Sequence, residues 1–429
     1  MSSDNSNNKG STKRKVVLVA TSRTAIGKMG GALHRHSPAE MGAHVLKCAV
    51  RKANIKHLSM IDQVIFGHAV QSYYEPNTAR VALQNAGLPE SINCYTVHQQ
   101  CASGMNAAFQ IWSEIAHGRN ELGIAVGVES MSSPHLMVNG AKRYTGLNKW
   151  LTQSSPKALR KLFKVFGPLP FFGLADSGLG PAYLARDPAK LNMMKTAQIV
   201  GNLVDISRSE ADQFAARSHA NALAAIASGR LAHEIDPMVI PGLGVFDTDE
   251  HPRVTDMKSL SKLSAVGGTG LITAGNASGM GDGACALVMC TVEMAEMLGL
   301  EPLAEIVDFC FTGRDAVSMG LGPVEAVREL LAANGLTVDQ IDYWELNEAF
   351  SHQVLSVMKC LGIDPNKVNE NGGGISLSHP LGMTGARIIG AAAWQLALKG
   401  GKLAVASLCV GGGMAGAALV KPYTKGESK

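Results

Sequence analysis

A weak internal repeat constrains the fold of this 429-residue chain more than any other feature of its sequence. Three pairs of segments resemble each other, and they occur in the same order along the chain at nearly the same offset. The pairs are 61–69 with 341–349, 101–105 with 379–383, and 124–130 with 404–410. One weak match would mean little, but three at nearly the same offset indicate two similar halves.

Each half is predicted to alternate strands with helices. In the first half we expect strands at 15–20, 64–67 and 122–128, with helices at 38–53 and 103–117. In the second half we expect strands at 304–309, 343–346 and 403–408, with helices at 323–334 and 382–399. Strands that alternate with helices of this length favour parallel sheets covered by helices, so the predicted fold class is α/β.

The long offset between the halves requires an inserted segment. We place it at 131–261, which is irregular, is rich in Pro and Gly at 167–188, and contains a helix-like run at 209–228. The predicted divisions are a disordered polar tail at 1–12, a first half at 13–130 and 262–293, an inserted loop domain at 131–261, and a second half at 296–425.

Composition excludes several classes of protein. A net charge of +4 is too small for a nucleic-acid-binding chain, which needs a dense basic face. The eight cysteines include no C-x-x-C pair, and they are too sparse for a secreted disulfide scaffold. Glycine clusters interrupt the uncharged stretches 264–281 and 403–420, which are otherwise long enough to span a membrane. The first dozen residues lack the apolar core of a signal peptide, so we expect a soluble, cytoplasmic enzyme.

Cys101 is the first candidate for a chemical role. It stands at a predicted strand-to-helix turn, where free N–H groups and the positive end of the helix dipole are expected to lower the pKa of the thiol. The thiolate would then act as a nucleophile. The alternative is a buried cysteine that acts as a small hydrophobe. The Ser-Gly pair that follows, and the matching turn in the other half, favour the nucleophile.

His379 occupies in the second half the place that Cys101 holds in the first. Pro380 after it suits the first turn of a helix. If the halves pack about a pseudo-twofold axis, both side chains point into one central site. Histidine is a natural base for a thiol because its pKa lies near neutrality. The rival histidines are His68, His98 and His352.

Two further segments end predicted strands. Residues 411–416 spell G-x-G-x-x-G literally, but too few residues follow for a dinucleotide-binding unit. The remaining interpretation is a strand-end cysteine, Cys409, followed by a glycine turn whose N–H groups line an oxyanion site. Asn347 and Glu348 follow the strand at 343–346, where α/β proteins place ligand chemistry, although the pair would serve equally as a helix cap.

Together these segments resemble the thiolase family. The resemblance rests on Q-C-x-S-G-M at Cys101, Asn347-Glu348-Ala349-Phe350, the glycine-rich segment before His379-Pro380, Cys409-x-Gly-Gly-Gly, and the segment 273–279. They occur in the family's order over about 15–423. The family fold implies two similar βαβαβ halves that form a five-layer α-β-α-β-α core, with an inserted loop domain. Among thiolases, the chain looks most like the β subunit of trifunctional enzymes.

The resemblance implies an acetyl-CoA C-acyltransferase that works through an acyl-cysteine. Cys101 would take the acyl group from a 3-ketoacyl-CoA, and His379 would activate Cys101 and later the thiol of the incoming CoA. Cys409 would protonate the departing acetyl-CoA carbanion or, in reverse, remove the α-proton. Such a division makes chemical sense, since one sulfur attacks carbon while another group exchanges a proton with carbon.

The same resemblance implies how developing negative charge would be held. One oxyanion site would combine His379 with a water held by Asn347. A second would use the backbone N–H groups of Cys101 and Gly411, while Glu348 would orient its neighbours. Preorganised donors of this kind make a metal unnecessary, so we expect no metal.

Coenzyme A is expected as a substrate, and no tightly bound cofactor is expected. The family pattern points to Arg253 for the adenine, to Ala274 and Ser278 for the pantetheine, and to Met193 for the acyl pocket. Basic residues of the insertion could attract phosphates, or they could form a solvated basic face. They are Lys142, Arg143, Arg160 and Lys161.

The chain departs from the family pattern in three places. Gly281 stands where the family usually has Asn, and Asn192-Met193-Met194 replaces the His-Met-Gly of short-chain acetoacetyl-type enzymes, which leaves the acyl chain length open. The stretch 151–190 is longer than in short-chain members and resembles the insertion of trifunctional-enzyme β subunits. Its aromatic and lysine residues would contact a membrane surface or a hydratase/dehydrogenase α subunit, or would fold as loop core.

The leading hypothesis is a degradative 3-ketoacyl-CoA thiolase of fatty acid β-oxidation with a preference for medium or long chains. The alternatives are a biosynthetic short-chain acetoacetyl-CoA thiolase, a decarboxylating ketoacyl synthase on the same fold, and a non-catalytic lipid or CoA carrier. The expected assembly is a homodimer or a dimer of dimers.

Overall fold

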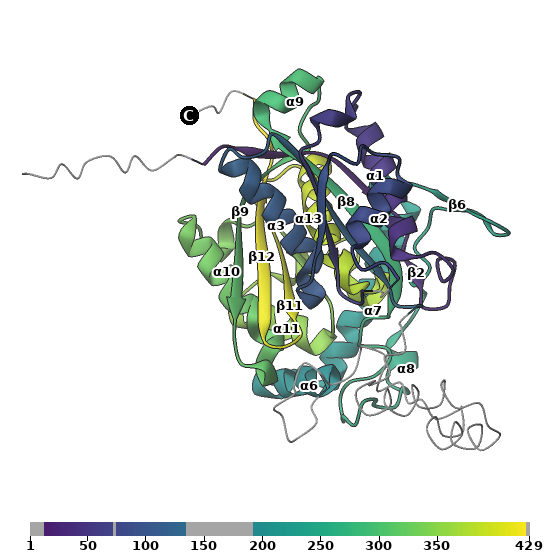
Figure 1. The fold of residues 1–429 in the computed structure, drawn as a ribbon. Coiled ribbons are helices and arrows are strands. Elements are labelled where there is room, and N and C mark those ends of the chain that lie inside the picture. Colours follow the sequence, from purple (N-terminus) through teal and green to yellow (C-terminus); the bar gives the residue numbers. More distant parts are fainter. Residues whose placement is uncertain (1–12, 72–73, 134–191, 426–429) are drawn as a thin grey trace, which may run out of the picture. The chain divides into compact units, whose positions relative to one another are not determined.

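The computed structural model describes residues 13–71, 74–133 and 192–425 (Figure 1). The sheet of the first half contains, in spatial order, β4, β3, β5, β8 and β1. Their bounds are β1 Val16–Arg23, β3 Gln63–His68, β4 Asn93–Val97, β5 Leu122–Ser130 and β8 Gly281–Thr291. β3 pairs in parallel with β4 and β5, whereas β8 is antiparallel to both β5 and β1. Four strands therefore run one way, and β8 runs the other.

The sheet of the second half repeats this arrangement. Its order is β10, β11, β12 and β9, with bounds β9 Ala304–Gly313, β10 Tyr343–Leu346, β11 Ala404–Val410 and β12 Met414–Lys421. β10 and β11 are parallel, and β12 is antiparallel to β11 and β9. The counterpart of β4 is reduced to a single parallel bridge between Trp344 and Val368.

Both sheets are mixed where the sequence favoured parallel ones, and the reason is a hairpin in each half. β11 turns straight back into β12 through the glycines at 411–413, and strands joined by so short a turn must be antiparallel. β5 and β8 pair in the equivalent way, with Ser130 opposite Asp282, although these two partners lie far apart along the chain. The insertion thus lies at the hairpin turn of the first half.

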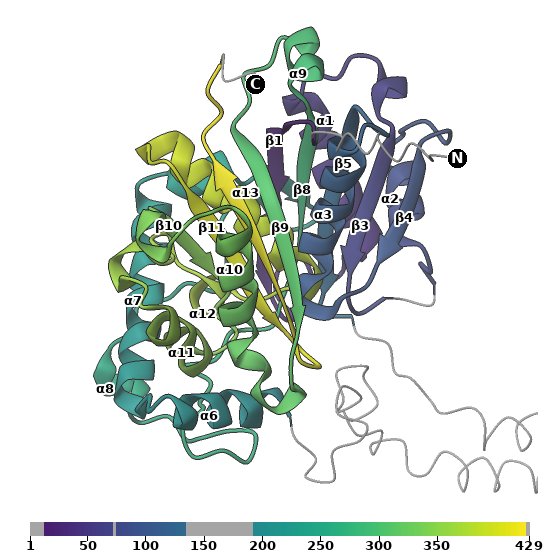
Figure 2. The ribbon, with the colours of Figure 1, turned by 90° about the vertical axis from the view of Figure 1, so that its left-hand side faces the viewer.

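The two sheets meet at their inner edges. β1 and β9 share only three residue pairs, from Val16 opposite Ile306 to Leu18 opposite Ala304. Figure 2 shows the resulting run of strands from β10 through β9 and β8 to β4. The repeat seen in the sequence is thereby confirmed as two equivalent sheets.

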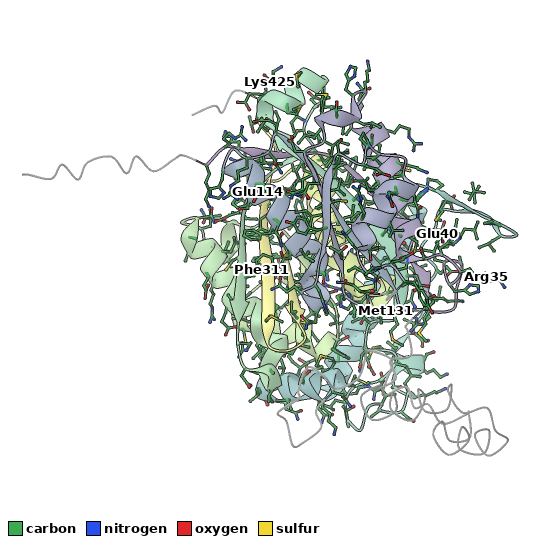
Figure 3. All side chains as sticks on the ribbon, in the orientation of Figure 1. Arg35, Glu40, Glu114, Met131, Phe311 and Lys425 are labelled. Carbon is green, nitrogen blue, oxygen red and sulfur yellow. The ribbon has the colours of Figure 1, made fainter. Side chains whose placement is uncertain are left out.

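Helices form the other three layers, which confirms the expected five-layer fold. α3 (Ser103–Ala116) and α13 (Leu381–Lys399) pack on each other and contact both sheets. α1 (Pro38–Lys52) and α2 (Thr78–Asn85) cover the outer face of the first sheet, and α10 (Gly322–Ala333) covers that of the second, with α11 (Ser351–Leu361) beside it. Phe311 of β9, labelled in Figure 3, packs edge-to-face on Phe109 of α3 with 5.4 Å between ring centroids.

Part of the predicted insertion falls within the described residues. α6 (Met193–Leu203) packs on α11, and α7 (Arg208–Ala227) packs on α11 and on α12 (Gly374–Leu377). A capping box between Ser207 and Glu210 begins α7, close to the helix predicted at 209–228. The remaining elements are short: β2 Gly27–Lys28, β6 Met238–Ile240, β7 Gly244–Phe246, α8 Met257–Leu260 and α9 Val292–Leu298.

The predicted strands and helices of the two halves are all present, with ends that differ by a few residues. The sequence prediction missed α2, β4 and α11, since it assigned only a turn between 67 and 103 and left the region after 350 unassigned. The uncharged stretch 403–420 forms β11, the glycine turn and β12. No helix in the described ranges combines the length and apolarity that a membrane span requires. The predicted tail at 1–12, the stretch 151–190 and the four basic insert residues lie outside the described residues.

Glycines let the N-terminal turns of α3 and α13 touch. A Cβ added to Gly104 of α3, or to Gly127 of β5, would lie 2.5 Å from the carbonyl oxygen of Gly382 in α13. A Cβ added to Gly382 would overlap the carbonyl oxygen of Val128 and lie 2.8 Å from that of Gly67. Backbone oxygens cannot move aside as flexible side chains can, so each position requires glycine.

We predict that Gly382→Ala destabilises the protein by about 2–4 kcal/mol, because the new methyl group must displace backbone on β3 and β5. Gly390→Ala on the same helix is the matched control. Its Cβ would meet neighbours no closer than 3.5 Å, and alanine suits a helix better than glycine by up to about 1 kcal/mol. Urea unfolding of both variants measures the difference; equal midpoints would contradict the proposed close contact.

Candidate active site

A sharp backbone turn presents Cys101. The 3₁₀ helix η2 (Gln100–Ala102) precedes α3, and Gln100 has a φ of 43°, which few non-glycine residues adopt. The hydroxyl of Ser103 stabilises this turn: it accepts from the backbone N–H of Gln99 at 2.9 Å and donates to the carbonyl of Gln100 at 2.7 Å. Cys101 is half-buried at the tip of the turn.

The same device presents His379 in the second half. Ser378, immediately before it, has a φ of 84°, and His379 leads through Pro380 into α13. α13 packs on η2, and Gly104 and Gly382 each lie three residues after their candidate side chain. The structure therefore brings the Cys101 turn and the His379 turn together, as the repeat predicted.

Hydrogen bonds define which ring nitrogen of His379 is free to accept a proton. Nδ1 lies 2.7 Å from Oγ1 of Thr384, and that hydroxyl donates to the carbonyl of Pro380 at 2.8 Å. Because the hydroxyl has only one hydrogen, it must accept from Nδ1–H. Nε2 then carries the lone pair and faces Nδ2 of Asn347 at 3.3 Å.

Burial makes His379 neutral at physiological pH. It lowers the pKa of His379 to about 4, and the positive charge of Arg387 acts in the same direction, against a smaller opposite effect of Glu129. The unprotonated Nε2 is therefore available as a base near pH 7.

The expectation that the turn lowers the pKa of Cys101 is wrong. Burial raises the pKa of Cys101 to about 11, even though the N–H groups of Gly411 and of Cys101 itself donate to the sulfur and act to lower it. The cost of removing a charged sulfur from water exceeds the gain from two donors. Cys101 is therefore a thiol at rest, and its proton must leave as it reacts.

Cys409 and Met193 lie close to this turn. Cys409 is buried at the end of β11, where burial and then the neighbouring Cys101 raise the pKa of its thiol. Met193, at the start of α6, places its sulfur 3.5 Å from the point where a Cβ on Gly411 would lie. An apolar cluster surrounds Cys409; its members are Ala197, Ile272, Met319, Ala349 and Phe350, with Met193, Met194 and Ala277 at its border.

Asn347 is buried at the end of β10, and its backbone N–H donates to the carbonyl of Ser407 on β11 at 2.9 Å. Its side-chain nitrogen faces His379, but its Oδ1 has no hydrogen-bond partner among the described residues. A buried amide oxygen normally accepts a hydrogen bond, so Oδ1 is a place where a small polar group would bind.

The hydrogen bonds of Glu348 reach the segment that precedes His379. Its carboxylate accepts from Oγ of Ser218 at 2.7 Å, from the N–H of Ile375 at 3.1 Å and from Nδ2 of Asn369 at 2.8 Å. Burial raises its pKa. Glu348 therefore holds the backbone of 369–375, the segment that leads to His379.

The residues predicted for CoA lie along one track. The guanidinium of Arg253, which is exposed, is 3.3 Å from Nε2 of His251, and a Cβ on Gly279 would overlap the ring of His251. Further along the chain, the N–H of Ser278 donates to the carbonyl of Ala349 at 3.0 Å. The carbonyl of the following residue, Gly279, accepts from the N–H of His379 at 2.9 Å. Ala274, on the same loop, is exposed. The track thus runs from Arg253 to the His379 turn.

The rival histidines have other environments. His68, on β3, is buried beside Glu129 of β5, with Nε2 and Oε1 3.1 Å apart. His98 is exposed after β4. His352, on α11, is buried, and neither ring nitrogen has a partner among the described residues. The sequence carried no motif for Glu129, which interacts electrostatically with both Cys101 and His379.

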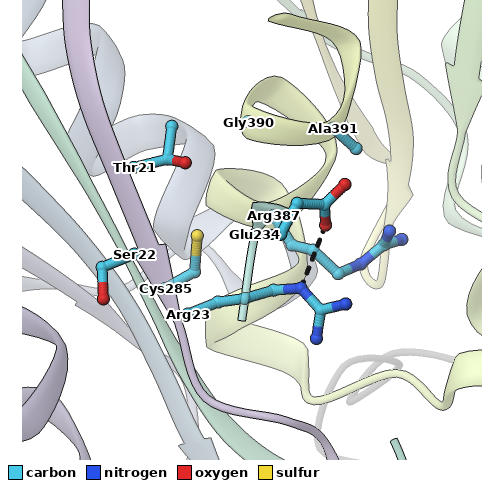
Figure 4. A pocket seen from close by; sticks show the side chains of 8 residues that line it. All are labelled: Thr21, Ser22, Arg23, Glu234, Cys285, Arg387, Gly390 and Ala391. Atoms are coloured by element: carbon cyan, nitrogen blue, oxygen red, sulfur yellow. Dashed lines mark hydrogen bonds and ion pairs between the residues drawn. The ribbon is translucent and has the colours of Figure 1, made fainter. Parts of the chain in front are cut away.

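Figure 4 shows a pocket beside α13. As far as the described residues define it, none of the predicted catalytic residues lines it; the lining residues are Thr21, Ser22, Arg23, Glu234, Cys285, Arg387, Gly390 and Ala391. Arg23 pairs there with Glu234 at 3.0 Å, and beyond it with Asp249 at 2.8 Å. The pocket therefore belongs to a buried ion-pair network. No group of three potential metal ligands occurs in the described part of the chain.

Comparisons with known proteins agree with this arrangement. The family model described as "Thiolase, N-terminal domain" matches residues 16–164 and 177–293, and "Thiolase, C-terminal domain" matches 300–422. The unmatched residues 165–176 fall within the stretch 151–190.

Relatives match over nearly the whole chain. An acetyl-CoA acetyltransferase of Syntrophomonas wolfei is 38% identical over 95% of this chain and 99% of its own length. A beta-ketothiolase of Cupriavidus necator is 38% identical over 95% and 98%. The crystal structure of human mitochondrial 3-ketoacyl-CoA thiolase in complex with CoA is 31% identical, with a TM-score of 0.84 over 96% of this chain and 98% of that one.

The departure at Gly281 has a structural reason in Ser378. A Cβ on Gly281 would lie 2.6 Å from Oγ of Ser378 and 2.9 Å from the carbonyl of Gly27. We predict that Gly281→Ala costs about 1–3 kcal/mol in the native chain. Ser378→Gly should stabilise by about 1 kcal/mol, because it relieves a backbone conformation that favours glycine.

In the Ser378→Gly background, the cost of Gly281→Ala should fall by about 1 kcal/mol, since only the contact with Gly27 remains. Urea unfolding of the two single variants and the double variant measures this coupling. An identical cost of Gly281→Ala in both backgrounds would refute the pairing.

Proposed function

The chain belongs to the thiolase family and is an enzyme of the acetyl-CoA C-acyltransferase type, and from this premise we propose that it cleaves 3-ketoacyl-CoA with CoA through an acyl group on Cys101. The observation that carries this assignment is the neutral His379, whose unprotonated Nε2 lies on the turn that touches the Cys101 turn. A thiol that is protonated at rest needs such a base.

In the first step, the sulfur of Cys101 attacks the 3-keto carbon while Nε2 of His379 takes the thiol proton. The S–C bond forms, the bond between the keto carbon and C2 breaks, and acetyl-CoA leaves as a carbanion. Cys409 gives that carbanion its proton. Burial favours the protonated, neutral form of Cys409, so this thiol holds the proton that the step requires.

The proton on His379 then returns to the Cys409 thiolate, and both groups regain their starting forms. In the second step, Nε2 of His379 takes the proton of the CoA thiol as its sulfur attacks the acyl group. The S–C bond to Cys101 breaks, and Cys101 recovers the proton from His379. Run backwards, the same steps form a carbon–carbon bond.

Two sets of donors support the oxyanions of these steps. The N–H groups of Cys101 and Gly411 already point at the sulfur of Cys101, so they also lie near a carbonyl bonded to that sulfur. For the second set, a water on the unpartnered Oδ1 of Asn347 would act with His379. CoA would follow the track from Arg253 past Ala274 and Ser278, with the acyl chain near Met193.

We propose a degradative enzyme for medium or long acyl chains, like the trifunctional-enzyme β subunit. The short-chain His-Met-Gly motif is absent at the start of α6, and the stretch 151–190 is long. The names of the relatives favour one other candidate, a short-chain acetoacetyl-CoA thiolase. Cys409 and Asn347 argue against a decarboxylating synthase, because such enzymes typically have a histidine at the positions of Cys409 and of the Asn347-Glu348 motif.

We also propose a homodimer, or a dimer of dimers, in the cytoplasm. β4 is an edge strand of the sheet, its residues are mostly half-buried, and Tyr95 on it donates to Gln110 of α3 at 2.6 Å. Such an edge favours pairing with another strand, here β4 of a second copy. An α subunit or a membrane surface would meet the stretch 151–190; that part of the proposal rests on the sequence.

The proposal predicts CoA-dependent loss of the 3-ketoacyl-CoA enolate absorbance when enzyme is added. Substrates with acyl chains from four to sixteen carbons, assayed side by side, measure kcat/KM against length. We expect kcat/KM to rise beyond four carbons; a maximum at four carbons would select the short-chain alternative. Absence of cleavage at every chain length would favour the non-catalytic lipid or CoA carrier.

A second prediction separates the two cysteines. Cys101→Ala should form no acyl-enzyme, whereas Cys409→Ala should still be acylated by a simple acyl-CoA, because that transfer needs no proton on carbon. Intact-protein mass spectrometry after incubation with butyryl-CoA measures the mass of the acyl group added to each variant. Equal acylation of the two would show that the roles are wrongly assigned. Acylation is a better readout here than alkylation at neutral pH, since the raised pKa of Cys101 keeps the thiolate scarce.

A further inference from the structure

Glu129 is a buried carboxylate that the steps above do not use. It lies fully enclosed at the end of β5, and the offset of the repeat makes it the counterpart of Cys409 at the end of β11. By the same offset, its partner His68 is the counterpart of Glu348. Both halves thus place chemically active side chains at the same two strand ends.

The carboxylate of Glu129 ties the two halves together beside His379. Oε2 accepts from the N–H of Ala69 at 3.2 Å and from the N–H of Gly382 at 3.0 Å, while Oε1 accepts from the N–H of Val70 at 3.1 Å. Ala69 and Val70 follow β3 of the first half. Gly382 belongs to the first turn of α13, three residues after His379. One side chain therefore spans the contact that aligns the active-site turns.

Several titratable groups surround this carboxylate. From β3, His68 places Nε2 3.1 Å from Oε1, an electrostatic contact without the alignment of a hydrogen bond. The others that face it or lie on adjoining elements are His98 after β4, Cys101 on η2, His379 before α13, Arg387 on α13 and Asp282 on β8. A full negative charge enclosed among them must favour protons on its neighbours.

We propose that Glu129 is a positioning residue for the catalytic pair: it holds the first turn of α13, and with it His379, against the end of β3, and its negative charge acts on both reacting groups. This inference rests on the proposed function.

The charge has opposite effects on the two reacting groups. It stabilises the imidazolium that forms on His379, and it disfavours a free Cys101 thiolate. Removal of the charge should therefore make Cys101 ionise more readily while His379 takes the proton less readily. Misplacement of side chains alone would not produce this combination.

The test compares Glu129→Gln, which removes the charge, with Glu129→Asp, which keeps the charge and shortens the reach to Gly382. Glu305→Gln is the matched control, since Glu305 is a buried carboxylate on β9 that pairs with Lys421 at 3.4 Å, at the end of that strand opposite to the active-site turns. Circular dichroism first establishes that each variant is folded.

Two measurements follow. The rate of Cys101 alkylation by iodoacetamide, read by mass spectrometry between about pH 8 and 10, reports the thiolate fraction without any substrate. The rate of acyl-enzyme formation from butyryl-CoA reports the reaction. We expect Glu129→Gln to shift the alkylation profile to lower pH and to slow acylation roughly ten- to hundredfold. Glu129→Asp should slow acylation with little shift of the profile, and Glu305→Gln should match the native protein.

Glu129→Asp keeps the inference testable if Glu129→Gln does not fold. An unshifted profile in folded Glu129→Gln, or acylation of a folded Glu129 variant at the native rate, would overturn it. If the native protein itself forms no acyl-enzyme, the proposed function fails instead, and alkylation still reports on Glu129.

Discussion

The contact of backbone with backbone at Gly382 is the constraint on which the rest of the molecule depends. Two central helices start from opposite sheets, and their first turns meet without intervening side chains. Cys101 and His379 lie at the same distance along the chain from that contact, so the packing of the halves is also the assembly of the site. The strained residues Gln100 and Ser378 turn each side chain inward from its helix start. Precision at the site therefore follows from the core and not from a flexible loop.

Burial also decides the resting charges of the site. Cys101 and Cys409 keep their protons, and His379 has none to lose from Nε2. No reacting group carries a full charge before substrate binds, so the site avoids the cost of isolated ions in a medium of low polarity. In the proposed reaction, charge appears only as bonds change, at positions where N–H groups and the carboxylate of Glu129 are already fixed. Preorganisation of this kind costs no rearrangement during the reaction.

Much of this was readable from the sequence because it is local or repeated. Apolar runs and the constant offset of the repeat located the strands and helices of both halves, and the motifs located Cys101, His379, Cys409 and Asn347. Other features depend on contacts between distant residues. Nothing in β8 alone reveals that it runs against β5, which lies far from it along the chain. The raised pKa of Cys101 comes from enclosure by other elements, and Glu129 carries no motif because its partners, at 69, 70 and 382, become neighbours only in the folded chain.

The equivalence of the two hairpins has a consequence for how such a molecule could arise. Where one half has a thiol the other has an imidazole, and where one has a carboxylate the other has a thiol, at matched places on the same scaffold. Two unaltered copies of the first half would place two thiols at the helix starts, and two copies of the second half would place two imidazoles there. A thiol facing an imidazole at those two positions would therefore arise only as the copies ceased to be interchangeable.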